Sequence, residues 1–332
     1  MGARLVTSPS YWQSEASMAE LRRNALTGEW VSIVGNRQAR PNLPTDGCPF
    51  CIGGLEAPEP YETLAFTNRW PAYSPGEVAD LDSYPLDSRT PAPAPGAAEV
   101  VLYSPSHEGS LGSLGVAQIR KVVDLWAERT AALLARPEIA YALVFESRGE
   151  EVGATIHHPH GQIYAFPFVP PAATAELAPA GEPCRVCAEV DVELAEGDRI
   201  VFESEHWVGF VPFASEYPFG VRLTARAHVG RLDQLNEAQR DSLAEALEDV
   251  LQRYDRLWSD DPRRSEIFPY LMWFHQQDAA GDPRHHLHVH FAPPQRSPGV
   301  PRFVAAGEVG SGTLSNPVLP EQAAEVLRGC LP

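Results

Sequence analysis

The sequence predicts an α+β fold made of two tandem copies of one unit, each an antiparallel sheet with one long helix packed on it. Each half of the 332-residue chain opens with a Cys-x-x-Cys pair, continues to a long amphipathic segment, and closes on a histidine cluster. The two halves are offset by 136 residues at the cysteines (48 to 184) and by 128 at the histidines (158 to 286). Strand-like segments come in runs instead of alternating with helices, which is typical of antiparallel sheets.

The elements of the first half follow from their periodicity. Residues 64–74 are rich in aromatic and β-forming side chains and predict strand structure. Residues 117–135 predict an amphipathic helix, because apolar residues such as Ile119, Val122 and Trp126 recur at steps of three and four. The apolar run 141–145 predicts the strand that follows the helix.

The second half repeats this order. Residues 199–212 predict strands, residues 237–258 a helix and residues 268–274 a strand. Two segments rich in proline and alanine, 90–98 and 170–183, are expected to be irregular connections. We therefore expect a flexible N-terminal arm over residues 1–18, a first domain over 19–172 that carries the nucleophile, and a second domain over 173–332.

Composition excludes several classes of partner. The chain has 44 acidic against 26 basic residues and a formal net charge of −18, which disfavours binding to nucleic acids or to an anionic membrane. No run of eighteen apolar residues and no signal-peptide pattern is present, so we expect neither a membrane span nor export. The expected location is the cytoplasm.

The cysteine spacing predicts a metal site in the first half. In a reducing compartment, a Cys-x-x-Cys pair more often binds metal than forms a disulfide. Cys48 and Cys51, together with His107 and one of His157 or His158, supply the tetrahedral sulfur and nitrogen set that Zn²⁺ prefers. Two buried free thiols and a surface histidine are the alternative.

The repeat predicts a second site of the same kind. Its ligands are Cys184, Cys187, His228 and His286 by the same register. Cys330 stands alone near the C-terminus and is expected to be inert.

The segment His158-Pro-His-Gly-Gln162 predicts a catalytic nucleophile. On a β-strand His158 and His160 point to the same face, so a zinc ion on His158 would anchor the neighbouring imidazole beside a pocket. A neutral imidazole attacks phosphorus readily, because the phosphoramidate that forms can pass its group to a second acceptor. A second metal on this strand is the alternative, and the amide of Gln162 weighs against it.

These motifs resemble those of the galactose-1-phosphate uridylyltransferases, a branch of the histidine-triad superfamily built from two fused triad domains. The resemblance covers nearly the whole chain and is most specific at His158-Pro-His-Gly-Gln162. It also includes the strings Cys48-Pro-Phe-Cys51, Thr67-Asn68, Ser104-Pro-Ser-His107 and Phe145-Glu146.

The resemblance implies a two-step transfer. His160 would attack the α-phosphorus of UDP-glucose and release glucose 1-phosphate, and galactose 1-phosphate would then take the uridylyl group from His160. Gln162 stands where hydrolytic triad proteins carry their last histidine. A sugar phosphate leaves with a pKa of about 6 and needs no general acid, so an uncharged amide suffices there.

The resemblance also implies roles for residues outside this motif. Arg37 and Arg40 would contact phosphates, Thr155 would lie beside the transferred phosphoryl group, and Asn68 and Trp70 would line the nucleoside site. Ser147 replaces an asparagine of the family near the phosphates, and Leu314 replaces its hexose-contacting glutamine, whereas Glu308 keeps the acidic match. An iron-type site would use Glu176, His275, His288 and His290.

The expected partners are a UDP-sugar and a hexose 1-phosphate, and the resemblance implies a homodimer in galactose metabolism. The presence of a Cys-x-x-Cys pair in each half also resembles the ADP-glucose phosphorylase branch. Adenylyl transfer on the same His160 is therefore an alternative. A nucleotide-binding protein without turnover is a second alternative, which the intact histidine motif disfavours. The sequence alone fixes neither the base nor the hexose.

Overall fold

The computed structural model describes residues 19–35, 47–87 and 89–331. Within these residues the centre of the molecule is a nine-stranded sheet in the order β3-β5-β7-β6-β11-β12-β10-β9-β8. Every neighbouring pair in it is antiparallel. β6 and β11, one from each half, pair with each other, so the two expected sheets are joined edge to edge into one.

The two halves contribute matching strands. The first half supplies β3 (Leu64–Thr67), β5 (Ala97–Leu102), β6 (Tyr141–Arg148) and β7 (His160–Phe166). The second supplies β8 (Ile200–Glu203), β9 (Trp207–Phe210), β10 (Val221–Ala225), β11 (Tyr270–His275) and β12 (His288–Ala292). Read outward from the β6/β11 pair, the order β6-β7-β5-β3 matches β11-β12-β10-β9, which gives the chain a pseudo-twofold arrangement.

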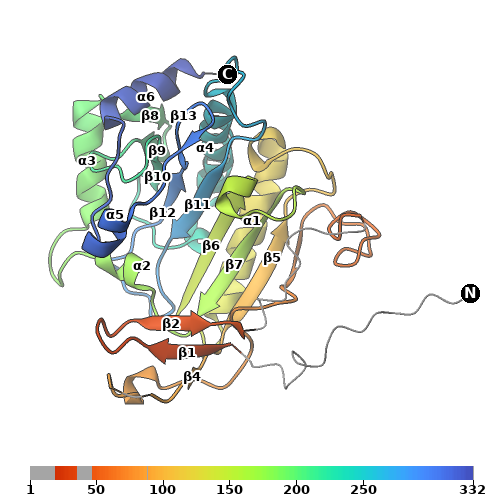
Figure 1. Ribbon diagram of the computed structural model, residues 1–332, viewed down its shortest axis with the longest axis vertical. Coiled ribbons are helices and arrows are strands. Elements are labelled where there is room, and N and C mark those ends of the chain that lie inside the picture. The colour runs from red at the N-terminus through yellow and green to blue at the C-terminus, as the bar shows by residue number, and fades with distance from the viewer. Residues whose placement is uncertain (1–18, 36–46, 88, 332) are drawn as a thin grey trace, which may run out of the picture.

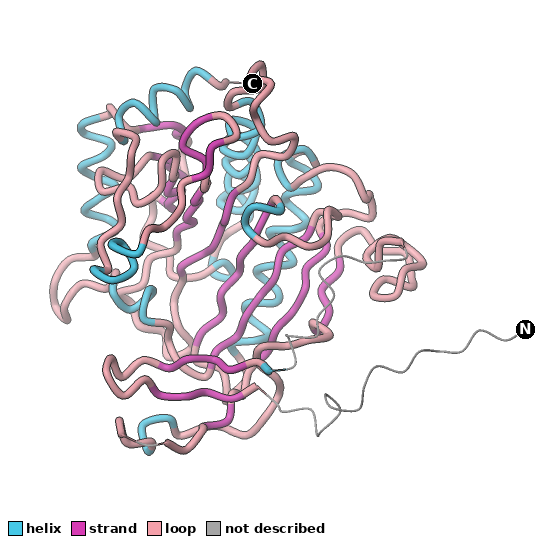
Figure 2. The backbone as a smooth tube through the Cα atoms, in the orientation of Figure 1, coloured by secondary structure: helices cyan, strands magenta, loops and turns pink. Residues whose placement is uncertain are grey.

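Two long helices cover one face of this sheet (Figures 1 and 2). They are α1 (Val116–Leu134) and α4 (Glu237–Arg256), and both bury an apolar stripe in the core that they share with the strands. A capping box fixes the start of α4, because Asn236 and Gln239 each accept the backbone N–H of the other. The core therefore runs continuously under both halves.

Side-chain alternation divides the strands into two faces. Ile163 of β7 and Val289 of β12 are buried in the core against the helices. His160, Gln162 and His288 lie at alternate positions of the same strands and point to the opposite face. The sheet therefore places the histidine motifs of both halves on one face, away from α1 and α4.

Smaller elements surround the large sheet. The three-stranded sheet β2-β1-β4 lies at one end of it (Figure 1). The strands of this sheet and of the hairpin β13-β14 are β1 (Glu20–Arg23), β2 (Trp30–Ile33), β4 (Ala92–Pro93), β13 (Gln295–Ser297) and β14 (Val300–Pro301). The remaining helices are α2 (Pro171–Ala175), α3 (Arg185–Glu196), α5 (Ala306–Ser311) and α6 (Pro320–Gly329).

The predicted long helices and most strands are confirmed, with bounds that differ by a few residues, whereas only Leu64–Thr67 of the segment 64–74 forms a strand. The prediction of irregular structure is wrong in two places. Segment 90–98 contains β4 and the start of β5, where the small side chains of Ala97 and Ala98 are buried. Segment 170–183 contains α2, whose first residue is a proline of the kind that begins helices well. Proline and alanine content alone therefore did not mark a linker.

Two further expectations concern the ends of the chain and its surroundings. The arm expected over residues 1–18 lies outside the described residues, and the domain boundary at 172/173 stays a prediction. Among the residues that the structure describes, no helix is long and apolar enough to cross a membrane.

The shared core generates a stability prediction. Leu247 of α4 is fully buried, so Leu247→Ala should lower the free energy of unfolding by about 2–5 kcal/mol through lost apolar contacts and a residual cavity. Val326→Ala on α6, where the side chain is 41% exposed, is the control and should change it by less than about 0.5 kcal/mol. Urea unfolding followed by circular dichroism measures both. Equal effects of the two substitutions would contradict the assigned core.

Candidate functional site

The first Cys/His cluster connects two loops to the start of β7. Cys48 and Cys51 lie before β3, His107 follows β5, and His158 precedes β7 by two residues. The Cys51 Sγ atom lies 3.6 Å from His107 Nδ1 and 3.8 Å from His158 Nδ1, and Cys48 Sγ lies 3.8 Å from His158 Nδ1. Of the two histidines left open by the sequence, His158 is the one in the cluster.

These atoms fit a tetrahedral metal. With Zn–S bonds of about 2.3 Å and Zn–N bonds of about 2.0 Å, the ligand atoms would be about 3.6 Å apart. His158 Nε2 lies 2.8 Å from the carbonyl oxygen of Ser104, and since a carbonyl only accepts, the ring's lone pair is on Nδ1, toward the sulfurs. Burial lowers the pKa of His158, while burial and Cys48 raise the pKa of Cys51. The ring therefore stays neutral, and a bound cation would favour the thiolates.

The second cluster repeats this geometry at the N-terminus of α3. Cys187 Sγ lies 3.4 Å from His228 Nδ1 and 3.3 Å from His286 Nδ1, and Cys184 Sγ lies 3.7 Å from His286 Nδ1. Burial lowers the pKa of His286 to about 4, and burial followed by the Cys184 charge raises that of Cys187 to about 11. The four residues predicted from the repeat are thus brought together as well.

The tautomers in the second cluster also match a metal site. His286 Nε2 lies 2.7 Å from the carbonyl oxygen of Ala225, and His228 Nε2 lies 2.9 Å from that of Pro283. Each ring therefore donates from Nε2 and directs the lone pair of Nδ1 toward the sulfurs.

A third cluster contains a carboxylate and three histidines. Glu176 Oε2 lies 2.7 Å from His275 Nδ1 and 3.2 Å from His288 Nε2, and Glu176 Oε1 lies 3.3 Å from His290 Nε2. His288 Nδ1 lies 2.7 Å from the carbonyl oxygen of His286, so in the neutral ring the Nε2 lone pair faces the carboxylate. Two acceptors that face each other in a buried place need a cation between them, and a divalent metal fits this donor set.

The pKa values of the third cluster agree with this electrostatic picture. Burial alone would raise the pKa of Glu176, but the contact with His275 and the nearby rings of His288 and His290 hold it far below its usual range. Burial lowers the pKa values of His275 and His290. The carboxylate is thus ionised, while these two rings are poor proton acceptors and remain available as ligands.

His160 is held by the residue that belongs to the first cluster. Its Nδ1 lies 2.8 Å from the carbonyl oxygen of His158, so Nδ1 carries the hydrogen and the lone pair is on Nε2. The Phe50 ring packs edge-on against the imidazole, with the ring centroids 5.1 Å apart. A pocket lies next to this ring and is lined by Glu146, Ser147, Arg148, His157, His158 and His160, among others. The geometry presents a neutral, oriented nitrogen nucleophile to this pocket.

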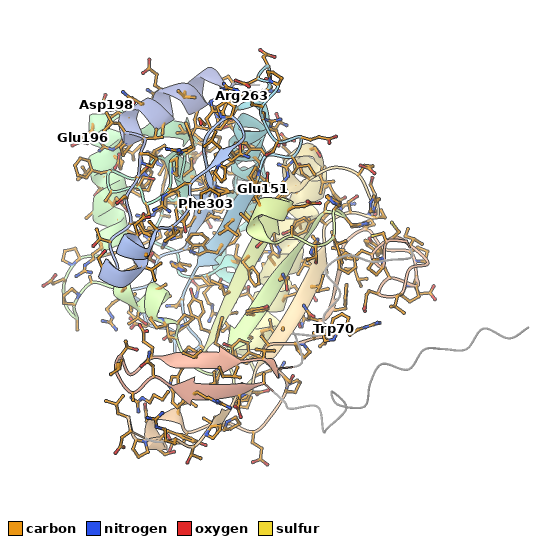
Figure 3. The ribbon with its side chains drawn as sticks, in the orientation of Figure 1. Trp70, Glu151, Glu196, Asp198, Arg263 and Phe303 are labelled. Carbon is orange, nitrogen blue, oxygen red and sulfur yellow. The ribbon has the colours of Figure 1, made fainter. Side chains whose placement is uncertain are left out.

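The predicted nucleoside residues lie close to Gln162. Asn68 Nδ2 donates to Gln162 Oε1 over 3.3 Å, and Asn68 Oδ1 accepts the backbone N–H of Trp70 over 2.9 Å. Figure 3 shows Trp70 beside the start of β5, where the backbone N–H of Asn68 is hydrogen-bonded to Ala98. Asn68 and Gln162 are therefore linked in one polar group on the face that carries His160.

Other predicted site residues are spread more widely. Ser147 lines the pocket beside His160, and Thr155 lies in the loop between β6 and β7. Arg37 and Arg40 lie outside the described residues. Glu308 accepts the backbone N–H groups of Ala305 and Ser315 at the start of α5 and pairs with Arg302, and it does not line the pocket beside His160.

Sequence reasoning missed two residues that support His160 and His158. Phe50 packs on His160 from within the Cys-x-x-Cys loop. The Tyr61 hydroxyl lies 2.7 Å from the carbonyl oxygen of Phe50 and 3.0 Å from His158 Nε2. The aromatic residue between the two cysteines was a usable signal for Phe50, whereas nothing in the pattern around Tyr61 marks it.

Together the sheet and the site define a protein with two tandem histidine-triad-like domains. Each half contains a strand bearing alternate polar side chains, and the residue two positions before that strand belongs to a Cys/His cluster. Family models give the particular family: the N-terminal and C-terminal domains of galactose-1-phosphate uridyl transferase match residues 47–170 and 184–332. The chain belongs to the galactose-1-phosphate uridyl transferase family.

Individual relatives agree with this assignment. The galactose-1-phosphate uridylyltransferase of Thermotoga maritima is 37% identical over 324 residues, which cover 94% of this chain and 98% of the relative. A solved uridylyltransferase superposes with a TM-score of 0.75 at 28% identity, covering 94% of this chain and 98% of that one. An ADP-glucose phosphorylase from Arabidopsis thaliana, solved with ADP-glucose, superposes with a TM-score of 0.69 at 26% identity, with coverage of 93% and 98%.

The clusters generate a prediction about metal content. Cys184→Ser should lose one metal ion per chain relative to wild type, together with some stability, because a structural metal contributes folding free energy. Cys330→Ser is the control and should lose none, since Cys330 belongs to no cluster among the described residues. Elemental analysis by plasma mass spectrometry and thermal unfolding measure the two effects. An unchanged metal content in the Cys184 variant would contradict the second site.

Proposed function

We propose that this chain moves a uridylyl group from UDP-glucose to galactose 1-phosphate through a covalent intermediate on His160. The observation that supports this most directly is the hydrogen bond from His160 Nδ1 to the carbonyl oxygen of His158, which puts the lone pair on Nε2. The family assignment and the names of the relatives support the choice of substrates.

The first step forms a bond between His160 Nε2 and the α-phosphorus of UDP-glucose. The bond from this phosphorus to the oxygen bridging the two phosphates breaks, and glucose 1-phosphate leaves with the electron pair. Because the departing phosphate has a pKa of about 6, it leaves as an anion without a proton from the enzyme. The amide of Gln162 can orient phosphoryl oxygens without competing as a proton donor.

The second step reverses the chemistry with a different acceptor. A phosphate oxygen of galactose 1-phosphate attacks the phosphorus, the bond to Nε2 breaks, and the imidazole returns to its neutral form with UDP-galactose released. The carbonyl of His158 stabilises the positive charge that develops on the ring in both steps, because it accepts the Nδ1 hydrogen throughout. The same geometry therefore serves both halves of the cycle.

Several substrate contacts belong to this proposal. We assign Asn68 and Trp70 to the nucleoside, and Ser147 and Thr155 to the phosphoryl oxygens. Arg37 and Arg40 would supply guanidinium groups for the two phosphates by resemblance to the family, as their planar forks suit. We assign the hexose to the region of Glu308.

The metals have a supporting role in this proposal. Zn²⁺ would bind Cys48, Cys51, His107 and His158, and a second ion would bind Cys184, Cys187, His228 and His286. With all four ligands supplied by the protein, each ion would be structural and would fix the loops that it joins. The cluster of Glu176, His275, His288 and His290 would hold a further divalent ion of the iron or zinc type. By resemblance we also propose a cytoplasmic homodimer that acts in galactose metabolism.

The covalent step generates the first functional prediction. Incubation with UDP-glucose should add the mass of one uridylyl group to the intact chain, and His160→Gly should abolish both this adduct and turnover. External imidazole should restore some release of glucose 1-phosphate in that variant by occupying the vacated space. His206→Gly, on the turn between β8 and β9, is the matched histidine control and should keep the adduct. Mass spectrometry of the intact chain measures it.

Two outcomes would contradict the proposal in different ways. If the His160 variant keeps wild-type exchange between UDP-glucose and labelled glucose 1-phosphate, His160 is not the nucleophile. If ADP-glucose labels the wild-type chain faster than UDP-glucose does, the reaction is adenylyl transfer on the same residue. The likeness to ADP-glucose phosphorylase makes this the comparison to run.

The hexose site generates a second prediction. Leu314 has no polar atom in its side chain, and a buried hydroxyl is discriminated strongly only where polar partners would be left unpaired. We therefore expect glucose 1-phosphate and galactose 1-phosphate to be accepted at similar rates. Competition kinetics measure the ratio of their kcat/KM values. A preference above about a thousandfold, or about 4 kcal/mol, would show that other residues read the hexose.

A further inference from the structure

A carboxyl group is buried directly behind the nucleophile strand. Glu146 of β6 is 5% exposed. Side chains alternate across a strand, so Glu146 faces the same side as Val144, which lies in the core shared with the helices, and the opposite side from Phe145. Glu146 Oε1 accepts the hydroxyl of Tyr270 of β11 over 2.8 Å. Glu146 also borders the pocket beside His160, but the mechanism described so far gives its carboxyl no role. Burying a carboxyl is costly unless its oxygens have partners.

The other oxygen of this carboxyl belongs to the surroundings of a second tyrosine, Tyr103. Glu146 Oε2 and the Tyr103 hydroxyl are both buried without a hydrogen-bond partner, and interaction between the two groups affects the pKa of each. Tyr103 directly follows β5, on the far side of β7 from Glu146. Its side chain must therefore pass over β7 to reach β6.

Gly161 is the residue that allows this passage. A Cβ atom built on Gly161 would lie 2.0 Å from the Tyr103 hydroxyl oxygen and 2.9 Å from the ring carbon that bears it. The glycine between His160 and Gln162 thus faces the core, not the substrate, and leaves room for the tyrosine. The tyrosine hydroxyl is packed against the backbone of the strand residue that joins the two catalytic side chains.

The second half of the chain provides an internal comparison. In the register of the two sheets, Val289 corresponds to Gly161, and Phe274, its neighbour on β11, corresponds to Glu146. Ala225, whose N–H bonds to the residue before β12, corresponds to Tyr103, whose N–H bonds to the residue before β7. All three counterparts are apolar and buried. The polar pair is therefore not needed to build the fold, and it occurs in the half that carries the nucleophile.

The charged and titratable groups that face Glu146 come from three directions. Tyr103 approaches across β7, Tyr270 lies on β11, and Arg148 lies two residues along β6, where it bonds Asp255 of α4 over 2.6 Å. Burial raises the pKa of Glu146 to about 7, while Tyr270, Arg148 and Tyr103 oppose the rise and Asp255 adds to it. No arginine or lysine among the described residues makes a salt bridge to this carboxyl, and the Tyr270 hydroxyl is its hydrogen-bond partner.

We infer that Tyr103 and Glu146 form a bridge across Gly161 that positions His160 and Gln162 for nucleotide transfer. This inference rests on the proposed function and adds Tyr103 and Glu146 as positioning residues. The strand that carries His160 is held at one end by the cluster on His158 and, one residue beyond His160, by the bridge at Gly161. Because transfer to phosphorus is sensitive to alignment of the attacking nitrogen, loosening the bridge should slow the chemical step more than it weakens substrate binding.

Tyr103→Phe tests the bridge, and Tyr270→Phe is the matched control. Both remove one hydroxyl from the environment of Glu146, but only Tyr103 crosses the nucleophile strand. We expect Tyr103→Phe to lower kcat for exchange between UDP-glucose and labelled glucose 1-phosphate by about tenfold or more, with KM within about threefold of wild type. Tyr270→Phe should lower the melting temperature at least as much, yet keep kcat within about threefold. Steady-state kinetics and thermal unfolding on the metal-loaded protein measure these effects.

Glu146→Gln gives an independent readout through the pH profile. The carboxylate accepts the Tyr270 hydroxyl and lies beside the Tyr103 hydroxyl, and its ionised form should hold the tyrosines best. Wild-type kcat should therefore rise as pH increases through about 7, and this part of the rise should disappear in Glu146→Gln. The inference is overturned if Tyr103→Phe keeps wild-type kcat, if both tyrosine variants lose kcat in proportion to stability, or if the Glu146→Gln profile matches wild type. Absence of exchange in the wild-type protein is a separate result, which contradicts the proposed function and this inference with it.

Discussion

His158 joins the Cys-x-x-Cys loop to His160 through two different atoms. Its Nδ1 faces the sulfurs of Cys48 and Cys51, and its carbonyl oxygen accepts the hydrogen of His160 Nδ1 over 2.8 Å. One residue therefore fixes both the start of β7 and the tautomer of the next histidine. If His158 moved, the ring of His160 would lose its orientation, and the lone pair would no longer be fixed on Nε2. The remaining features of the site depend on this junction, including the packing of Phe50 on the imidazole.

The two halves show how one framework supports two chemistries. His288 repeats the hydrogen bond of His160 to the residue two positions before it, so its Nε2 also carries a lone pair. In the second half this nitrogen faces Glu176 and lies beside His275 and His290, which makes a set of metal ligands. In the first half the same place on the strand is followed by the amide of Gln162. In our proposal, the difference between a nucleophile and a metal ligand thus comes from the neighbours that the sheet register supplies.

Much of this arrangement could be predicted from the sequence. The repeat gave the tandem architecture, and cysteine and histidine spacing gave the two Cys/His clusters, because local patterns and ligand chemistry determine both. The pairing of β6 with β11 could not be predicted, since it depends on long-range contact between halves that each form a plausible sheet. Glu146 and Tyr103 were missed for the same reason, because their relation exists only across three paired strands. Gly161 was visible in the motif, but its role required knowing which face it occupies.

In the proposed reaction, His160 Nε2 becomes bonded to phosphorus. The most direct test is ³¹P NMR of the protein labelled with ¹⁵N at the Nε2 position of its histidines and incubated with UDP-glucose. Our account predicts a phosphoramidate resonance that is split by coupling to this nitrogen and is absent from His160→Gly. A resonance without this splitting would place the phosphorus on Nδ1 or on another residue, and would contradict the tautomer on which the mechanism depends.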